Sequence, residues 1–386
     1  MGSGIYLDYQ ASTPLDPRVT EAMAPYWTEF CGNAHSGEHA FGWAADEAVE
    51  DARARVAGLV GADPDEIVFT SGATEANNLA LLGMARAAAP ERRKVVVSAI
   101  EHKSVLAAAR ALTEEGFDLT VVPVGPDGVV DRGALASAVD SRTAVVSVMA
   151  VNNEVGTSQP LRHIADACDE AGAPFHVDAA QAMAFLPIDV VGTGIDLMSL
   201  SAHKCCGPKG VGAIYVRRGL SPRPRPLTFG GGQEGGLRPG TLPVPLCVGF
   251  GEACAILERE RAKDTLHAAA LRDRFLGELR RRLPDVRVNG TMDGRHPGNL
   301  NLHFPGVEAT LLLNALQPHV AAASGSACTS GFQEPSHVLR AMGLTPSEAA
   351  CSVRFGMGRF ATEADIMRAA ELVASAVADL RLAGAA

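Results

Sequence analysis

The chain has 386 residues, 34 of them basic and 44 acidic, so its formal net charge of −10 disfavours direct nucleic-acid binding and membrane-surface binding, which use clustered cations. No apolar run approaches the roughly 20 residues of a membrane-spanning helix, the first residues lack the form of a signal peptide, and eight cysteines without a Cys-x-x-Cys pair indicate a reducing compartment. These properties predict a cytoplasmic enzyme, and the length predicts two domains.

Short apolar runs alternate with amphipathic stretches through the first two thirds of the chain. The runs predict seven strands, at Glu66 to Thr70, Lys94 to Ile100, Leu119 to Val124, Thr143 to Val151, Phe175 to Asp178, Asp196 to Ser201 and Gly212 to Arg217. The stretches between them predict helices at Ala73 to Ala88, Lys103 to Glu115 and Leu161 to Ala171. Continuous Val and Ile runs between helices are typical of a parallel sheet covered on both faces, so we expect an α/β fold of the open, doubly wound kind.

The last third of the chain has a different character. Residues 221–240 are rich in proline, arginine and glycine, which predicts a loop. A long helix is then expected from about Val244 to Leu283, with its many charges on a solvated face. Residues 286–386 predict short strands and helices that form a smaller second domain.

Lys204 is the lysine with the most informative setting. It lies in the segment SLSAHKCCGPKG, directly after a predicted strand, and functional groups gather at the carboxyl ends of strands in a doubly wound sheet. A lysine in a partly dry pocket has a lowered amine pKa, which suits Schiff-base chemistry. The alternative is a surface lysine beside a Gly-Pro turn.

Two further segments suggest a phosphorylated cofactor. FTSGATEANN, from Phe69, predicts a strand, a glycine turn and a helix start, whose free N–H groups could bind a phosphate together with the Thr74 hydroxyl. Ser71 and Thr74 could instead be simple helix caps. FHVDAAQ ends a strand at Asp178, an acid that the pyridinium nitrogen of pyridoxal 5′-phosphate (PLP) would pair with. Phosphate cradle, buried acid and lysine are the three parts of a PLP site.

The sequence resembles the cysteine desulfurases of the NifS/IscS type, which are fold-type I PLP enzymes of the class V aminotransferase family. The matching segments include IYLDYQASTPLDPRV, EHKSV, VNNEVG, HVDAAQ, GGGQEGGLRPGTLPV, SGSACTSGFQEPSHVLRAMGL and VRFGMGRF. The resemblance covers nearly the whole chain. It implies a large PLP-binding domain at 13–248 with a mainly parallel seven-stranded sheet, and a smaller α/β domain formed by 1–12 and 249–386.

The resemblance also implies which residues hold the cofactor. Lys204 would form the Schiff base, His102 would stack on the pyridine ring, and Asp178 would pair with the ring nitrogen. Gln181 would contact the phenolic oxygen. The phosphate would be held by Ala73, Thr74, Ser201 and His203. Thr241 would reach the phosphate of the other subunit, which implies a homodimer.

The implied reaction converts L-cysteine to L-alanine. Asn153 and Arg354 would hold the substrate carboxylate. Lys204 would move the proton at Cα, and His102 would move protons on the substrate thiol. Cys328, in the SGSACTSG loop, would accept the sulfur as a persulfide and pass it to an acceptor protein. No metal is implied.

The physiological acceptor stays open. Iron–sulfur relatives carry a longer tail that meets the scaffold protein, whereas this chain ends at Ala386, so either an iron–sulfur scaffold or a dedicated thiolation protein could receive the sulfur. A selenocysteine lyase or a short-loop desulfurase would share the PLP contacts. From another class, the chain could be a nucleotide-binding module or a catalytically silent partner, which would be colourless.

The remaining cysteines are expected to be structural. Cys247 and Cys254 are seven residues apart on one helical face, which predicts core positions, and Cys168 is expected to pack within its helix. Cys205 and Cys206 follow the proposed Schiff-base lysine. They are either small hydrophobic residues or thiols able to interfere with the persulfide.

Overall fold

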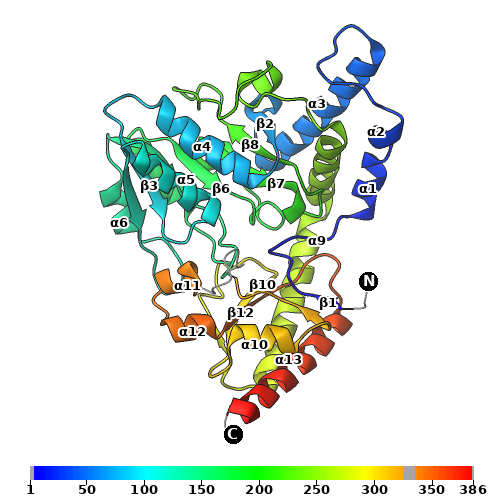
Figure 1. Cartoon of the computed structure of the whole chain (residues 1–386), viewed down its shortest axis with the longest axis vertical. Coiled ribbons are helices and arrows are strands. Elements are labelled where there is room, and N and C mark those ends of the chain that lie inside the picture. The colour runs from blue at the N-terminus through cyan, green and yellow to red at the C-terminus, as the bar shows by residue number, and fades with distance from the viewer. Residues whose placement is uncertain (1–3, 326–334, 385–386) are drawn as a thin grey trace.

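The computed structural model describes residues 4–325 and 335–384 of the chain. Figure 1 shows an upper part built around a large sheet and a lower part with smaller sheets and the C-terminal helices. The long helix α9 (Val244–Arg282) runs from one part into the other (Figure 1). In the described ranges, we find no helix with the length and apolar character required to cross a membrane.

The large sheet has seven strands in the order β2-β8-β7-β6-β5-β3-β4. Their bounds are β2 (Ile67–Thr70), β3 (Lys94–Ser98), β4 (Asp118–Val122), β5 (Thr143–Ser147), β6 (Phe175–Asp178), β7 (Leu197–Ser201) and β8 (Gly212–Val216). The pairings from β7 to β4 are parallel, whereas β8 is antiparallel to both β7 and β2. The link 202–211 is too short for a crossover helix, so β8 returns antiparallel. The prediction of a mainly parallel sheet is confirmed.

The helices of the upper part cover the sheet or lead into it. They are α1 (Pro17–Met23), α2 (Pro25–Thr28), α3 (Ala40–Val60), α4 (Ala73–Ala87), α5 (Lys103–Glu114), α6 (Arg132–Ala138), α7 (Leu161–Glu170) and α8 (Val190–Thr193). Short 3-10 turns lie at η1 (Pro64–Glu66), η2 (Ala202–Lys204) and η3 (Gln233–Gly236).

Alternate residues of the central strands face opposite layers of helices. Val95 and Val97 of β3 pack in a core with α4 and α5. Val96 packs in a second core, which contains residues of α3, α7 and the first half of α9. Both faces of the sheet are therefore covered, which explains why its strands are continuous apolar runs.

The predicted strand Thr143 to Val151 exceeds the observed strand β5 (Thr143–Ser147) by the largest margin among the predicted strands. The apolar run Thr143 to Val151 stays buried throughout, but the strand itself ends at Ser147. The N–H groups of Val148 and Ala150 still donate to the backbone oxygens of His176 and Asp178 in β6, and the segment then leads to Asn153. Residues on both sides of the strand end are apolar because all of them are buried, so the amino-acid composition does not show where the strand ends.

The lower part combines short strands with the C-terminal helices. Its elements are β1 (Ile5–Tyr6), β9 (Arg287–Val288), β10 (Asn299–His303), β11 (Val320–Ala321), β12 (Ser352–Gly356), α10 (Ala309–Ala315), α11 (His337–Ala341), α12 (Pro346–Ala350) and α13 (Glu363–Gly384). β10 pairs antiparallel with β9 and β12, and β1 pairs parallel with β11. The start of the chain thus joins its last third.

Helix α9 contributes to both main cores. Phe250 and Leu257 belong to the core beneath the large sheet, whereas Phe275 and Leu279 belong to the core of the lower part. The observed helix confirms the long helix predicted from about Val244 to Leu283. The domain limits at 13–248, and at 1–12 with 249–386, stay a prediction.

Candidate active site

A cavity of about 640 Å³ lies where several strands of the large sheet end, and residues of the lower part also line it. The carboxyl ends of parallel strands meet at one edge of a sheet, which is why residues far apart in sequence gather here. Ten of the predicted site residues line this cavity: Ala73, Thr74, His102, Asn153, Asp178, Gln181, Ser201, His203, Lys204 and Arg354.

Lys204 follows β7 at the end of the turn η2 and lines the cavity. Its Nζ donates to the backbone oxygens of Gln10 at 2.5 Å and of Ala11 at 2.9 Å. Burial, followed by the positive charge of Arg354, lowers the pKa of Lys204 to about 8. At neutral pH about a tenth of such an amine is unprotonated and able to attack a carbonyl carbon.

The turn that carries Lys204 is held by the N-terminal segment. The backbone N–H and the hydroxyl of Thr13 both donate to the His203 oxygen, at 3.0 and 2.9 Å. On the other side of Lys204, the Cys206 N–H donates to the Thr13 hydroxyl at 2.8 Å, and the Asp16 N–H donates to the Cys206 oxygen at 3.0 Å. The lysine backbone is therefore fixed on both sides.

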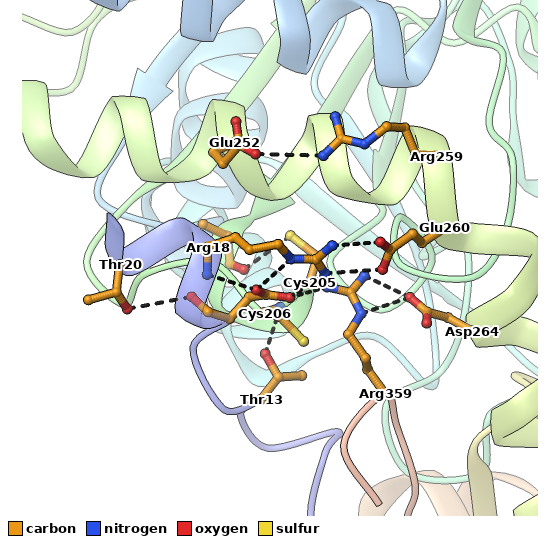
Figure 2. A network of polar contacts seen from close by, with 12 residues as sticks. Thr13, Arg18, Thr20, Cys205, Cys206, Glu252, Arg259, Glu260, Asp264 and Arg359 are labelled. Carbon is orange, nitrogen blue, oxygen red and sulfur yellow. Dashed lines mark hydrogen bonds and ion pairs between the residues drawn. The ribbon is translucent and has the colours of Figure 1, made fainter. Parts of the chain in front are cut away.

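This segment is anchored by a network of ion pairs, which Figure 2 shows from close by. Asp16, only 1% exposed, accepts from Arg18 and from Arg359, both at 2.8 Å. Arg359 also binds Asp264 of α9 at 2.7 Å, and Arg18 binds Glu260 of α9 at 2.6 Å. The hydrogen bond from Arg18 is the main cause that lowers the pKa of Asp16 to about 2. The network joins the N-terminal segment, α9 and the segment after β12.

Cys205 and Cys206 lie beside this network (Figure 2). Both are buried, at 2% and 6% exposed, and burial raises the pKa of each thiol. Cys205 Sγ donates to the Ala202 oxygen at 3.1 Å. Buried protonated thiols are poor nucleophiles, so the structure supports their interpretation as small hydrophobic residues. Burial of Cys168, Cys247 and Cys254 confirms their predicted core positions.

Asp178 is the last residue of β6 and is 4% exposed. Its carboxylate accepts from the Ala180 N–H at 3.0 Å and from Asn77 Nδ2 at 2.7 Å. No lysine, arginine or histidine of the described ranges forms an ion pair with it. A buried carboxylate without an ion-pair partner is suited to pair with a cationic group that enters the cavity.

The start of α4 forms another wall of the cavity. The helix begins after Gly72, which has no side chain to cap it and has a φ of 147° in the region that favours glycine. Ser71 and Thr74 do not occupy the cap position, so the alternative interpretation of them as caps is wrong. Ser201 and His203 line the same cavity. Uncapped N–H groups at a 15-residue helix favour an anion such as a phosphate.

Arg354 of β12 faces the same cavity from the lower part. It binds Asp8 through Nη2 at 2.7 Å and donates from Nη1 to the Asn153 oxygen at 2.9 Å. Its Nε is buried without a hydrogen-bond partner among the described residues. The guanidinium is thus held in place and retains donor capacity for a carboxylate.

Two predicted residues are not part of this cavity as described. Thr241 is exposed and does not line it. Cys328 lies outside the described residues, although Gly325, the last described residue before that gap, lines the cavity.

Three contributors were not predicted from the sequence. Gln10 and Ala11 bind the lysine through backbone oxygens, which carry no side-chain signal. Asp8 pairs with Arg354 across almost the whole chain length. The segment IYLDYQASTPLDPRV, part of the resemblance, was the only sequence signal for them.

Comparison with known proteins identifies the family. The aminotransferase class-V family matches residues 5–368, a span that includes every residue lining the cavity. The chain belongs to this family. It is 51% identical over 377 residues to the cysteine desulfurase IscS of Rickettsia akari (strain Hartford), covering 98% of this chain and 92% of that protein.

Solved structures of the family agree with the fold. A NifS-like protein matches with a TM-score of 0.91 at 34% identity, over 97% of this chain and 100% of that chain. SspA in complex with cysteine matches with a TM-score of 0.78 at 34% identity, over 92% of this chain and 99% of that chain. The resemblance stated from the sequence motifs and the predicted fold class are both confirmed.

Proposed function

We propose that this chain is a PLP-dependent cysteine desulfurase that converts L-cysteine to L-alanine and receives the sulfur on Cys328. The observation that carries the proposal is Lys204, a half-buried lysine of lowered pKa that shares one cavity with Asp178 and the start of α4. The full-length similarity to proteins named cysteine desulfurase supports the substrate and the reaction.

The residues present fit PLP. Lys204 would attach the cofactor, Asp178 would face its ring nitrogen, and Gln181 its phenolic oxygen. The phosphate would be held by Ala73, Thr74, Ser201 and His203. Burial of His203 lowers its pKa to about 4, so this side chain is neutral there and acts as a hydrogen-bond donor or acceptor. When bound, PLP stabilises negative charge at the Cα atom of the substrate.

Arg354 and Asn153 would orient the substrate by its carboxylate. Arg354 is already fixed by Asp8 and by the Asn153 backbone, so little side-chain entropy is lost on binding. L-cysteine would then place its amine toward Lys204 and its thiol toward Gly325, where the chain leads to Cys328.

Lys204 and Cys328 would divide the chemistry. The Lys204 amine takes the proton from Cα and returns a proton to the product. The Cys328 thiolate attacks the substrate sulfur, so that the carbon–sulfur bond breaks and a sulfur–sulfur bond forms. The sum is L-cysteine plus the Cys328 thiol giving L-alanine plus a Cys328 persulfide, which an acceptor protein then discharges.

We also propose a homodimer. Several large aromatic side chains near the start of the chain are exposed, with Trp27 62% and Trp43 59% accessible, and Phe229 is 89% accessible. A second copy of the chain would cover such exposed apolar side chains. The exposed Thr241 would reach the phosphate site of the other subunit.

The test is an absorption spectrum of the purified protein combined with product analysis. We expect a visible band that borohydride bleaches, a spectral change with L-cysteine, and equal amounts of alanine and releasable sulfide. Lys204→Ala should abolish turnover. A colourless protein that PLP does not reconstitute would contradict the cofactor assignment, and preferential turnover of selenocysteine would favour a lyase.

A further inference from the structure

Asn77, in the first turns of α4, connects two of the proposed site residues, Asp178 directly and His102 through Ser104. It is wholly buried, at 0% exposed, and is not among the residues that line the cavity. Its Nδ2 donates to Asp178 Oδ2 at 2.7 Å and to Ser104 Oγ at 2.9 Å. An ionised carboxylate only accepts hydrogen bonds, so the Asn77 amide must turn its NH₂ group toward Asp178. Both amide hydrogens are then used.

Ser104 connects the oriented Asn77 amide to His102 by hydrogen bonds. Because its Oγ accepts from Asn77, its hydroxyl proton is free to donate to His102 Nδ1, which lies 2.8 Å away. The Ser104 backbone N–H donates to the same nitrogen at 3.2 Å. With two donors aimed at it, Nδ1 has no room for a proton of its own. A neutral His102 therefore carries its proton on Nε2.

We propose that Asn77 is a positioning residue that, through Ser104, fixes His102 as a neutral ring protonated on Nε2 while it orients Asp178. His102 then acts as a hydrogen-bond donor toward the cavity and not as the resting base. Proton removal at the substrate Cα falls to Lys204. This inference deepens the proposed function and rests on it for the identity of the reaction.

The charges around the ring agree with a neutral histidine. Burial is the main cause that lowers the pKa of His102. Asp178 on β6 opposes this effect, whereas Lys204 on η2, His337 on α11 and Lys103 on α5 add to it. The two hydrogen bonds at Nδ1 also stabilise the neutral form.

The decisive variant is Asn77→Asp, compared with Asn78→Asp on the same helix. A carboxylate at position 77 can only accept, so the Ser104 hydroxyl would turn toward it, and only the Ser104 backbone N–H would still donate to His102 Nδ1. The Asn78 side chain donates to the Thr74 oxygen at 2.8 Å and does not line the cavity, so its variant adds the same charge without changing the hydrogen bonds among Asn77, Ser104 and His102.

The measurement is a pH titration of the PLP-loaded protein by ¹⁵N-histidine NMR, with His102→Gln used to assign the signal. We expect the Nε2-protonated form in the natural protein and a pKa of His102 that is about one unit or more higher in Asn77→Asp. Asn78→Asp should titrate as the natural protein does. An Nδ1-protonated ring in the natural protein, or equal titrations in the two variants, would overturn the inference.

Ser104→Ala is a second variant for the same measurement of the His102 pKa, for the case that Asn77→Asp does not fold. This variant removes the hydroxyl donor and keeps the backbone N–H, so we expect a smaller rise in the pKa of His102. An unchanged pKa would overturn the inference. Alanine formation by the natural protein is assayed separately. An inactive protein with an Nε2-protonated His102 would contradict the proposed function alone.

Discussion

The polar atoms around the Lys204 amine are backbone oxygens. Gln10 and Ala11 accept its hydrogen bonds, and no carboxylate of the described ranges forms an ion pair with it. The cost of burying the ammonium is therefore not offset by a paired negative charge, and its pKa falls. Burial is the main cause of the lowered pKa and the positive charge of Arg354 the second, whereas Asp178 and Asp8 oppose them.

Cys328→Ser is the residue-scale prediction. We expect the variant to keep bound PLP and to change its spectrum with L-cysteine, but to form alanine at least about 100-fold more slowly, because a serine hydroxyl is not ionised as a thiolate is. Cys31→Ser is the control, since Cys31 is an exposed cysteine without a proposed role. Equal rates of alanine formation by the natural protein and Cys328→Ser would contradict the assignment of the nucleophile.

At the scale of elements, residues 10–16 connect parts that are distant in sequence. The segment binds the lysine turn through Thr13 and reaches α9 through Asp16 and Arg359. Each connection is formed by hydrogen bonds or ion pairs of buried or half-buried groups, for which losing one partner is costly. The segment therefore contributes both stability and the position of Lys204.

Asp16→Asn should lower the free energy of unfolding by about 2 kcal/mol at pH 7, since the pKa of Asp16 is lowered from 3.8 to about 2 in the folded chain. Because the folded chain lowers the pKa of Asp16, its ionised carboxylate stabilises the fold at pH values above the ordinary pKa of 3.8. This contribution is lost as the pH falls toward 2. The difference between the two proteins should thus shrink below pH 4. Urea unfolding at fixed protein concentration measures the free energy of unfolding of both proteins at each pH.

Asp285→Asn is the matched control for that experiment. Asp285 pairs with Arg381 at 2.7 Å, but both side chains are partly exposed. Pairs of this kind contribute about 0–1 kcal/mol. If Asp285→Asn lowered the free energy of unfolding as much as Asp16→Asn, the buried network would contribute no more stability than a partly exposed ion pair.

At the scale of the whole molecule, one cavity gathers residues from both parts of the described chain. Thr241 is exposed and lies outside the cavity lining, and Trp27, Trp43 and Phe229 are exposed in the described part of the chain. A second copy would cover the apolar side chains and bring Thr241 to a neighbouring phosphate site.

We therefore expect light scattering to give the mass of two chains, and Trp27→Glu combined with Trp43→Glu to shift the population toward monomer. Loss of PLP on dilution should accompany that shift. Leu382→Glu, at a side chain that is 74% exposed near the C-terminal end, should leave the dimer intact. A natural protein that is monomeric at micromolar concentration would contradict this prediction.

The elements of the large sheet were predictable because each has a local pattern. The strand Phe175–Asp178 was predicted with its observed limits, and α4, α5 and α7 were each predicted within one residue of their ends. Most cavity residues were predictable because they follow these strands or match a long motif. The antiparallel direction of β8 was not predictable from such a pattern, since the direction depends on the short link between β7 and β8.

The sequence alone determined the α/β alternation, the family and the lysine, because periodicity, strand-end position and long motifs are local properties of the chain. Only the tertiary structure decided which groups surround that lysine. Asp8, Arg354 and the backbone oxygens of Gln10 and Ala11 meet at Lys204 through folding, and backbone acceptors leave no trace in the side-chain pattern. The pKa of Lys204 depends on these distant contacts, and the proposed tautomer of His102 depends on the contact between Asn77 and Ser104, because desolvation and hydrogen bonding are set by the packed environment.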